Sequence, residues 1–282
     1  MLCRIGEIEV WRILEWQGLF LPPEELFPNA PPDVAQIMED LAPGTVDAGS
    51  GRIILPVQAY LLKTPDQVVL VDTGIGNHKT SKSLPFWSDL IDTRFLSALA
   101  AAGVAPEDVD FVVFTHLHTD HVGWNTTLRD GAWTPTFPNA KYLMPDADVE
   151  MLSGRGLAIY DESLAPVIDA GLVDRIGADF PHSDQISLLA TPGHSPGHVS
   201  VLLSSQGQEA VLTGDALHST AQCQHPHWQF KFDSDPDLAV ASRRTLLETC
   251  VARDLTVIGS HFTLPSIGKV TSDGDAFRWT EP

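Results

Sequence analysis

The stretch THLHTDHVGW, residues 115–124, places three histidines and one aspartate within six residues, directly after the apolar run FVVF at residues 111–114. The apolar run predicts a buried β-strand, because short runs of β-branched and aromatic residues are typical of core strands. A buried polar side chain without a partner costs roughly 2–7 kcal/mol, and a charged one costs more. A bound metal is the simplest partner for four such side chains at the end of a core strand.

The spacing within this stretch favours two metal positions. His116 and His118 are two residues apart, so both point to the same side of an extended strand end. Asp120 and His121 follow where the chain must turn, and they could bind a neighbouring metal. Imidazole and carboxylate ligands suit zinc, with iron and manganese as alternatives.

Three more polar stretches follow apolar runs later in the chain: LLATPGHSPGH (188–198), AVLTGDALH (210–218) and TVIGSHF (256–262). They offer five further candidates, which are His194, His198, Asp215, His218 and His261. Residues that end core strands tend to converge on one rim, and a carboxylate such as Asp215 could bridge two cations there. The remaining histidines are isolated or lie in a proline-containing loop, so we expect them to be ordinary polar residues.

Composition limits the class of protein. The 282 residues are 43% hydrophobic and 19% charged, which is typical of a soluble globular protein. The net charge of −20 argues against a nucleic acid or an anionic membrane as partner. Three cysteines without a CxxC pair exclude a disulfide framework and a thiolate zinc site. The first residues carry charges throughout, unlike a signal peptide, so we expect a cytoplasmic protein.

Short strands interleaved with a few helices predict a mixed α and β architecture in one domain, residues 1–282. Strands are expected at 5–16, 53–62, 68–71, 111–114, 140–144, 186–190, 199–203, 210–213 and 255–258, and helices at 34–41, 94–102 and 235–253. Residues 18–50 contain six prolines and predict an arm or lip laid over the body.

The histidine-rich motif resembles the HxHxDH signature of the metallo-β-lactamase superfamily. VDTG (71–74), TPGHSPGH (191–198), TGD (213–215) and GSH (259–261) resemble its remaining motifs, in order, so the resemblance covers about residues 53–270. It implies an α+β fold, an αββα sandwich of two mixed sheets flanked by helices, with a dinuclear metal site at one edge. The N-terminal arm and the tail HFTLPSIGKV (261–270) most resemble the methyl parathion hydrolase and quorum-quenching lactonase branch.

The resemblance also implies a ligand set. The first metal would be bound by His116, His118 and His194, the second by Asp120, His121 and His261, with Asp215 as bridge and with Asp72 and His198 as supporting residues. Two divalent ions, zinc in the first instance, would share a hydroxide that attacks the substrate. Asp120 is the expected catalytic residue, because it could carry a proton to the leaving group.

Three other functions stay open at this point. A mononuclear iron oxygenase of the persulfide dioxygenase kind would keep many of the same residues. A thioesterase resembling glyoxalase II would need basic residues for glutathione, and this acidic chain has few. A non-catalytic binding module would have no need for all seven ligand positions.

Aromatic residues occur in segments that we expect to surround the metals. These are Phe86, Trp87, Trp124, Trp228 and Phe230, and Phe262 lies beside His261 but is equally suited to the core. An aromatic mouth with few cationic residues favours a small neutral ester, lactone or phosphotriester over a polyanion. The expected partner is thus a small-molecule substrate, with no nucleic acid and no membrane, and a homodimer is left open.

Overall fold

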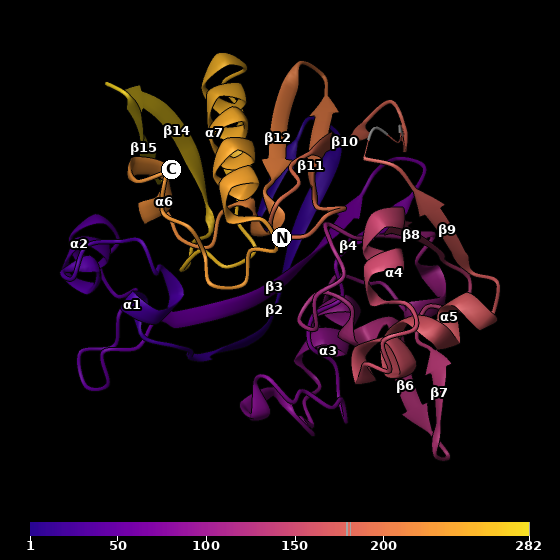
Figure 1. Ribbon diagram of the computed structural model, residues 1–282. Coiled ribbons are helices and arrows are strands. Elements are labelled where there is room, and N and C mark those ends of the chain that lie inside the picture. The colour runs from indigo at the N-terminus through magenta and orange to yellow at the C-terminus, as the bar shows by residue number, and fades with distance from the viewer. Residues whose placement is uncertain (179, 181, 282) are drawn as a thin grey trace. The chain divides into compact units, whose positions relative to one another are not determined.

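The computed structural model describes residues 1–178, 180 and 182–281, and it divides into two compact units between which the chain alternates. Unit 1 comprises Met1–Glu15 and Val57–Gly177, and unit 2 comprises Trp16–Pro56 and Ala178–Pro282. Each unit contains one large sheet (Figure 1). Among the described residues, no helix combines the length and apolarity that a membrane crossing requires. The expectation of a single domain stays a prediction.

Unit 1 is built on a sheet of seven strands in the order β1-β2-β3-β4-β5-β8-β9. The strands are β1 (Cys3–Ile5), β2 (Ile8–Leu19), β3 (Ile54–Lys63), β4 (Val68–Val71), β5 (Phe111–Val113), β8 (Lys141–Pro145) and β9 (Val173–Ile176). The sheet is mixed, because β3 and β4 are antiparallel whereas β4, β5, β8 and β9 are parallel. A separate hairpin joins β6 (Thr126–Arg129) to β7 (Ala132–Pro135).

The helices of unit 1 cover the apolar face of this sheet. They are α3 (Arg94–Ala101), α4 (Asp146–Leu152) and α5 (Ala165–Asp169), with the short turns η1 (Pro85–Trp87), η2 (Pro106–Asp108), η3 (Gly123–Asn125) and η4 (Tyr160–Leu164). Phe95 and Leu99 of α3 are four residues apart, so they lie on one helix face, and both are buried in the core with Val112 of β5. This packing fixes β5, whose end carries the histidine-rich segment.

Unit 2 has a six-stranded sheet in the order β10-β11-β12-β13-β14-β15. The strands are β10 (Ile186–Ala190), β11 (Val199–Ser205), β12 (Gln208–Leu212), β13 (Thr256–Ile258), β14 (Ile267–Asp273) and β15 (Ala276–Thr280). Only the β12–β13 pair is parallel among these neighbours, so this sheet is mixed as well. The helical elements are α1 (Pro23–Leu26), α2 (Val34–Leu41), η5 (Gly214–Ala216), α6 (Ala221–Gln224) and α7 (Pro236–Ala252).

The long helix α7 begins where the sequence predicts it. The Asp235 side chain accepts a hydrogen bond from the backbone N–H of Leu238 at 3.1 Å, and Pro236 occupies the first helical position. The helix packs along β14, and Leu246 and Leu247 join Val257 of β13 in one core (Figure 1). This core fixes the ends of β12 and β13, which are followed by the TGD and GSH motifs.

The structure also contains elements that were not expected, among them β6, β7, β9, α4 and α5. Residues 8–16 of the strand expected at 5–16 lie in β2, and Gly6, with a φ of 56°, turns the chain before it, so that β1 and β2 form a hairpin. The tail forms the hairpin of β14 and β15, for which no strand was expected. Residues 18–50 contain α2 at the expected position, and Phe27 of this segment packs on Trp228 within unit 2.

Candidate metal centre

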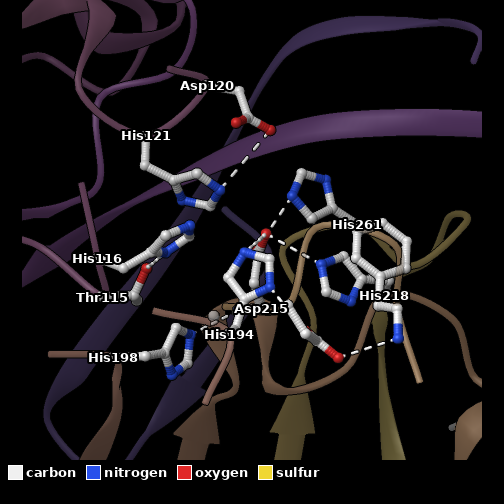
Figure 2. Close-up of polar contacts among 12 residues, drawn as sticks. Thr115, His116, Asp120, His121, His194, His198, Asp215, His218 and His261 are labelled. Atoms are coloured by element: carbon white, nitrogen blue, oxygen red, sulfur yellow. Dashed lines mark hydrogen bonds and ion pairs between the residues drawn. The ribbon is translucent and has the colours of Figure 1, made fainter. Parts of the chain in front are cut away.

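The end of β5 gathers the four candidates of the HLHTDH motif within unit 1. His116 and His121 are buried, and the centroids of their rings are 4.0 Å apart. The His118 ring lies 4.5 Å from the His116 ring, in an edge-on orientation. Asp120 presents one carboxylate oxygen 3.7 Å from Nε2 of His121 (Figure 2). Six consecutive residues therefore supply three imidazoles and one carboxylate to the same region.

Asp72 holds this segment from the end of β4. Its backbone has a φ of 60°, a left-handed conformation that is strained for a residue other than glycine. Its carboxylate accepts hydrogen bonds from the backbone N–H of Thr115 at 2.9 Å and from the Thr115 hydroxyl at 2.8 Å. The same carboxylate lies 2.9 Å from Nδ1 of His121. Asp72 thereby fixes both the start of the motif and the orientation of one of its rings.

A second buried carboxylate, Glu15 of β2, supports the same region and was missed from the sequence. It accepts hydrogen bonds from the backbone N–H groups of Ile75 and Gly76, at 2.6 and 3.0 Å, and from the indole of Trp124 at 2.5 Å. Burial raises the pKa of Glu15 to about 7, although these three donors oppose the shift. In the alternating pattern of the first strand, nothing distinguishes Glu15 from a solvent-exposed position.

Backbone contacts around Glu15 leave no space for side chains. A Cβ on Gly123 would lie 1.8 Å from the carbonyl oxygen of Ile75, and a Cβ on Gly74 would lie 2.0 Å from the Glu15 carboxylate. The Gly123 N–H donates to the Gly74 carbonyl at 2.7 Å. The turn after Asp72 and the turn after His121 are thus locked against each other.

In unit 2, three imidazoles surround the carboxylate of Asp215. Their Nε2 atoms lie 3.3 Å (His194), 3.2 Å (His218) and 3.2 Å (His261) from its oxygens (Figure 2). Asp215 and two of these residues, His194 and His218, form a group whose ligand atoms all lie within 4.8 Å of one another. Asp215 lies in η5, shortly after the end of β12. Its position therefore depends on the end of a strand that was predicted from the sequence.

Two of the unit 2 imidazoles, His194 and His261, are each held by a residue far away in the sequence. Nδ1 of His194 lies 3.0 Å from Asp233, and Nδ1 of His261 lies 2.8 Å from the carbonyl oxygen of Pro56. His198 accepts the backbone N–H of Asp215 at 2.9 Å. Of these supporting residues, only His198 was expected from the sequence. Asp233 and Pro56 belong to no motif and gave no signal.

Arg243, from the middle of α7, is fully buried and stabilises the segment between Asp215 and Asp233. It donates to the carbonyl oxygens of Ala216, Pro226 and Trp228, at 2.7, 3.0 and 2.7 Å. Burial lowers the pKa of Arg243 to about 10. This cation was also not singled out from the sequence.

His218 was noted beside Asp215 but left out of the predicted ligands. Its ring stacks on Phe230, with centroids 3.4 Å apart, and no group among the described residues bonds its Nδ1. Burial lowers the pKa of His218 to about 3, so its imidazole is neutral. For His194, burial disfavours the charged form, but hydrogen bonds to Asp215 and Asp233 outweigh burial and raise the pKa to about 9.

The hydrogen bonds of the rings test whether these residues suit a metal. A histidine ligand presents one ring nitrogen to the metal while the other is fixed by a carboxylate or a carbonyl. His121, His194 and His261 have this arrangement, with Nδ1 fixed and with Nε2 directed towards a candidate carboxylate ligand. Imidazole and carboxylate donors match the ligand types of zinc and related divalent ions. The residues therefore fit a metal centre.

Comparison with known proteins assigns the family. The model of the metallo-β-lactamase superfamily matches residues 52–261, which is most of the chain. The chain belongs to the metallo-β-lactamase superfamily. This membership confirms the predicted family, the α+β fold with two mixed sheets flanked by helices, and the class of metal-dependent hydrolases.

Relatives of this metallo-β-lactamase superfamily protein include lactonases. An N-acyl homoserine lactonase of Bacillus cereus is 28% identical over 242 residues, which are 81% of this chain and 88% of that protein. The N-acyl homoserine lactonase AiiA of Bacillus thuringiensis subsp. kurstaki is 29% identical over 70% of this chain and 78% of its own length.

Solved structures share the metallo-β-lactamase fold over the whole length. The hydrolase AbOPH superimposes with a TM-score of 0.82 at 24% identity, over 99% of this chain and 96% of that chain. AidC, a dizinc quorum-quenching lactonase, superimposes with a TM-score of 0.80 at 20% identity, over 99% and 96% of the two chains. At these identities the likeness shows the fold alone.

The aromatic residues expected around the metals of this metallo-β-lactamase protein are mostly buried. Trp124 stacks on Phe95 in the core of unit 1, with centroids 5.6 Å apart. Trp87 is 2% exposed, and Phe86 beside it is 38% exposed. In unit 2, Trp228 and Phe230 both pack on Phe27, and Phe262 packs on Trp279. Their contribution to substrate binding stays a prediction.

Proposed function

We propose that the chain is a dinuclear hydrolase that acts on a small neutral ester, lactone or phosphotriester. His116, His118 and His194 would hold one cation, Asp120, His121 and His261 a second, and Asp215 both. The observation that carries the proposal is the pairing of fixed imidazoles with carboxylates in both units: His121 with Asp72 and Asp120, and His194 with Asp233 and Asp215.

Two bound divalent cations, zinc in the first instance, would lower the pKa of a water molecule towards about 7 and polarise the bond under attack. The protein contributes orientation and proton transfer. Asp72 and Asp233 fix the Nδ1 atoms of two rings, so those rings cannot rotate away from the site. Asp120 is 11% exposed and therefore accessible to a substrate, so it can take up a proton and deliver it to the leaving oxygen.

The substrate class follows from charge and from the relatives. The chain has 17 Lys and Arg against 37 Asp and Glu, which disfavours polyanionic substrates. Relatives that match 81% of the chain are named N-acyl homoserine lactonases, and AidC is described as a dizinc lactonase. These names support a neutral ester-type bond as the bond that is cleaved.

Metal analysis combined with a substrate panel tests the proposal. We expect two zinc ions per chain and turnover of lactones, aryl esters or phosphotriesters, with little turnover of nucleotides or glutathione thioesters. His116→Ala should lose metal and activity, whereas the matched variant His227→Ala, at an exposed position, should keep both. One iron per chain and no zinc in active protein would instead support the oxygenase alternative.

A further inference from the structure

We propose that His218 is a metal ligand, and that it completes, with His194 and Asp215, a site for one divalent cation that lies wholly in unit 2. The ligand atoms of these three residues all lie within 4.8 Å of one another, and no residue of unit 1 is needed to form the group. This inference adds a ligand to the metal centre of the proposed function, and it rests on that proposal only for the presence of a divalent cation.

The distances within this group suit direct coordination. Nε2 of His194 and Nε2 of His218 lie 3.3 and 3.2 Å from the same carboxylate oxygen of Asp215, Oδ2 (Figure 2). A tetrahedral zinc ion that is about 2.0–2.2 Å from its nitrogen and oxygen ligands keeps those ligand atoms about 3.2–3.6 Å apart. The observed separations fall in this range, so a cation can be bound with little movement of the side chains.

Two imidazoles and one carboxylate form a donor set that is sufficient for a metal site. This combination holds catalytic zinc in some enzymes and Fe(II) in others, with the remaining positions open to water or substrate. One sheet positions all three residues, because His194 follows β10, Asp215 and His218 follow β12, and both strands pair with β11. The fold of unit 2 therefore brings a complete set of ligands together.

The ring of His218 is held with Nε2 directed at Asp215. The ring stacks on Phe230, with centroids 3.4 Å apart and an angle of 13° between the planes. The backbone N–H of His218 donates to Oε1 of Gln222 at 2.7 Å, and the Gln222 amide donates to the Trp228 carbonyl at 3.2 Å. Because the stack fixes the ring plane and the backbone is anchored, little conformational entropy remains to be lost on binding a cation.

The tautomer of His218 can change, whereas acceptors fix a hydrogen on Nδ1 of His194 and of His261. No group among the described residues bonds Nδ1 of His218. Without a cation, its Nε2–H donates to Asp215 at 3.2 Å. As a ligand, Nε2 must offer its lone pair, so the hydrogen has to be on Nδ1. Because Nδ1 has no partner in either tautomer, the change breaks no hydrogen bond other than the one that the cation replaces.

The contacts of Asp215 argue against a role of His218 that is limited to orienting this carboxylate. Nε2 of His194 and Nε2 of His261 already lie 3.3 and 3.2 Å from its two oxygens, and His198 accepts its backbone N–H at 2.9 Å. A third imidazole adds one hydrogen bond but leaves a buried nitrogen unsatisfied, and these two effects are similar in size. A bond from Nε2 to a cation compensates the burial of the ring more fully than this hydrogen bond does.

Magnetic resonance of the metal-loaded wild type tests the coordination directly. In protein with ¹⁵N in its histidine rings and loaded with ¹¹³Cd²⁺, Nε2 of His218 should show coupling to the cadmium nucleus, and the ring hydrogen should be on Nδ1. His218→Phe, which can keep the stack on Phe230, identifies the signals of this ring. A ring of His218 that has no coupling to bound cadmium and keeps its hydrogen on Nε2 would overturn the inference. Protein that binds no divalent ion would refute both the inference and the proposed function.

A variant without the unit 1 ligands separates this inference from the proposed function. It carries alanine at four positions of the HLHTDH motif, which are His116, His118, Asp120 and His121. It should be inactive but still bind one Co²⁺ per chain, measured by calorimetry and by the visible absorption of the ion. Adding His218→Phe should weaken this binding at least about tenfold, and adding the exposed control His227→Ala should not.

The outcomes distinguish the two proposals. Loss of all Co²⁺ binding in a four-alanine variant with the circular dichroism of wild type, or equal affinity with and without His218, would overturn the inference and leave the proposed function intact. A wild type that binds a cation through His218 but hydrolyses no ester, lactone or phosphotriester would refute the proposed function alone. If the four-alanine variant does not fold, the cadmium coupling in the wild type decides.

Discussion

The two units assemble their candidate ligands in opposite ways. In unit 1, four ligands come from the six residues 116–121 shortly after β5, and one carboxylate, Asp72, holds this segment through two hydrogen bonds to Thr115 and one to His121. In unit 2, the ligands come from three separate strand ends, and each has its own remote support. His194 depends on Asp233 and His261 depends on the Pro56 carbonyl, 39 and 205 residues away.

This difference explains which parts of the site a sequence can show. A contiguous motif after an apolar strand can be recognised as a site from the sequence, because local chain geometry already brings its members together. A distributed site can be recognised only when the fold is known. The contrast also predicts that a change at Asp72, which holds the contiguous motif at two residues, costs more metal affinity than a change at Asp233, which holds one ring.

The largest effects are expected from the two acidic ligands. Asp120→Asn removes the proton carrier and should lower kcat by about 10²- to 10⁴-fold. Asp215→Asn removes the acceptor around which three imidazoles gather, so metal content should fall as well as kcat. Steady-state kinetics with metal analysis of both variants measures this. Full turnover in Asp120→Asn would refute the assigned role of that residue.

The next largest effect is on the free energy of unfolding, and it should differ between two aromatic residues, one from each unit. Trp228 is fully buried against Phe27 and His225, so Trp228→Ala should lower the free energy of unfolding by about 3–5 kcal/mol. Phe86 is 38% exposed, so Phe86→Ala should cost far less. Chemical denaturation of both variants gives the comparison. A stable Trp228→Ala protein with altered KM would instead favour a role at the substrate mouth.

Smaller effects are expected from the two carboxylates that support histidine rings, one in each unit. Asp72→Asn and Asp233→Asn each weaken the hold on one ring nitrogen, and loss of such a support typically costs 10- to 100-fold in metal affinity or activity. Because Asp72 also holds Thr115, its variant should lose more affinity than Asp233→Asn does. Competition with a zinc chelator measures both. The reverse order would show that the hydrogen bonds from Thr115 add nothing to the hold of Asp72 on the motif.

The smallest effect is on the pH dependence of stability, which should have opposite signs for Glu15 in unit 1 and Glu39 in unit 2. Burial raises the pKa of Glu15 to about 7, so its contribution to stability is full below about pH 4.5 and is lost as pH rises through 7. Relative to Glu15→Gln, wild type should lose on the order of 2 kcal/mol between pH 4.5 and 7.5.

Glu39 is the control with the opposite sign. Hydrogen bonds from the backbone N–H groups of Gly44 and Val46 lower the pKa of Glu39, so its contribution is present at neutral pH and is lost as pH falls. Denaturation curves of wild type, Glu15→Gln and Glu39→Gln at pH 3, 4.5, 6 and 7.5 should therefore show opposite trends: the Glu15 contribution is lost between pH 4.5 and 7.5, and the Glu39 contribution is lost between pH 4.5 and 3. Parallel trends would exclude a buried, neutral Glu15.

Sequence patterns predicted the elements that depend on short stretches of the chain. The buried strand before His116 and the helix capped by Asp235 both follow from short-range signals, and both are present. The supports Glu15 and Asp233 could not be found in this way, because each looks like an ordinary acidic residue until a strand or a loop from elsewhere meets it. The hairpin of β14 and β15 was missed for a different reason: its strands have too few alternating apolar and polar positions to be recognised.

The locked glycine turns around Glu15 have a consequence for how new substrate preferences can be engineered. Gly74, Gly76 and Gly123 admit no side chain, so the chain up to Gly76 has a single workable geometry. Residues 80–83 follow only a few residues later, outside this fixed region, and they line a cavity of about 250 Å³ in unit 1. Library diversification of residues 80–83 can therefore change the lining of this cavity, while the position of Asp72 and of the ring that it holds remains as it is.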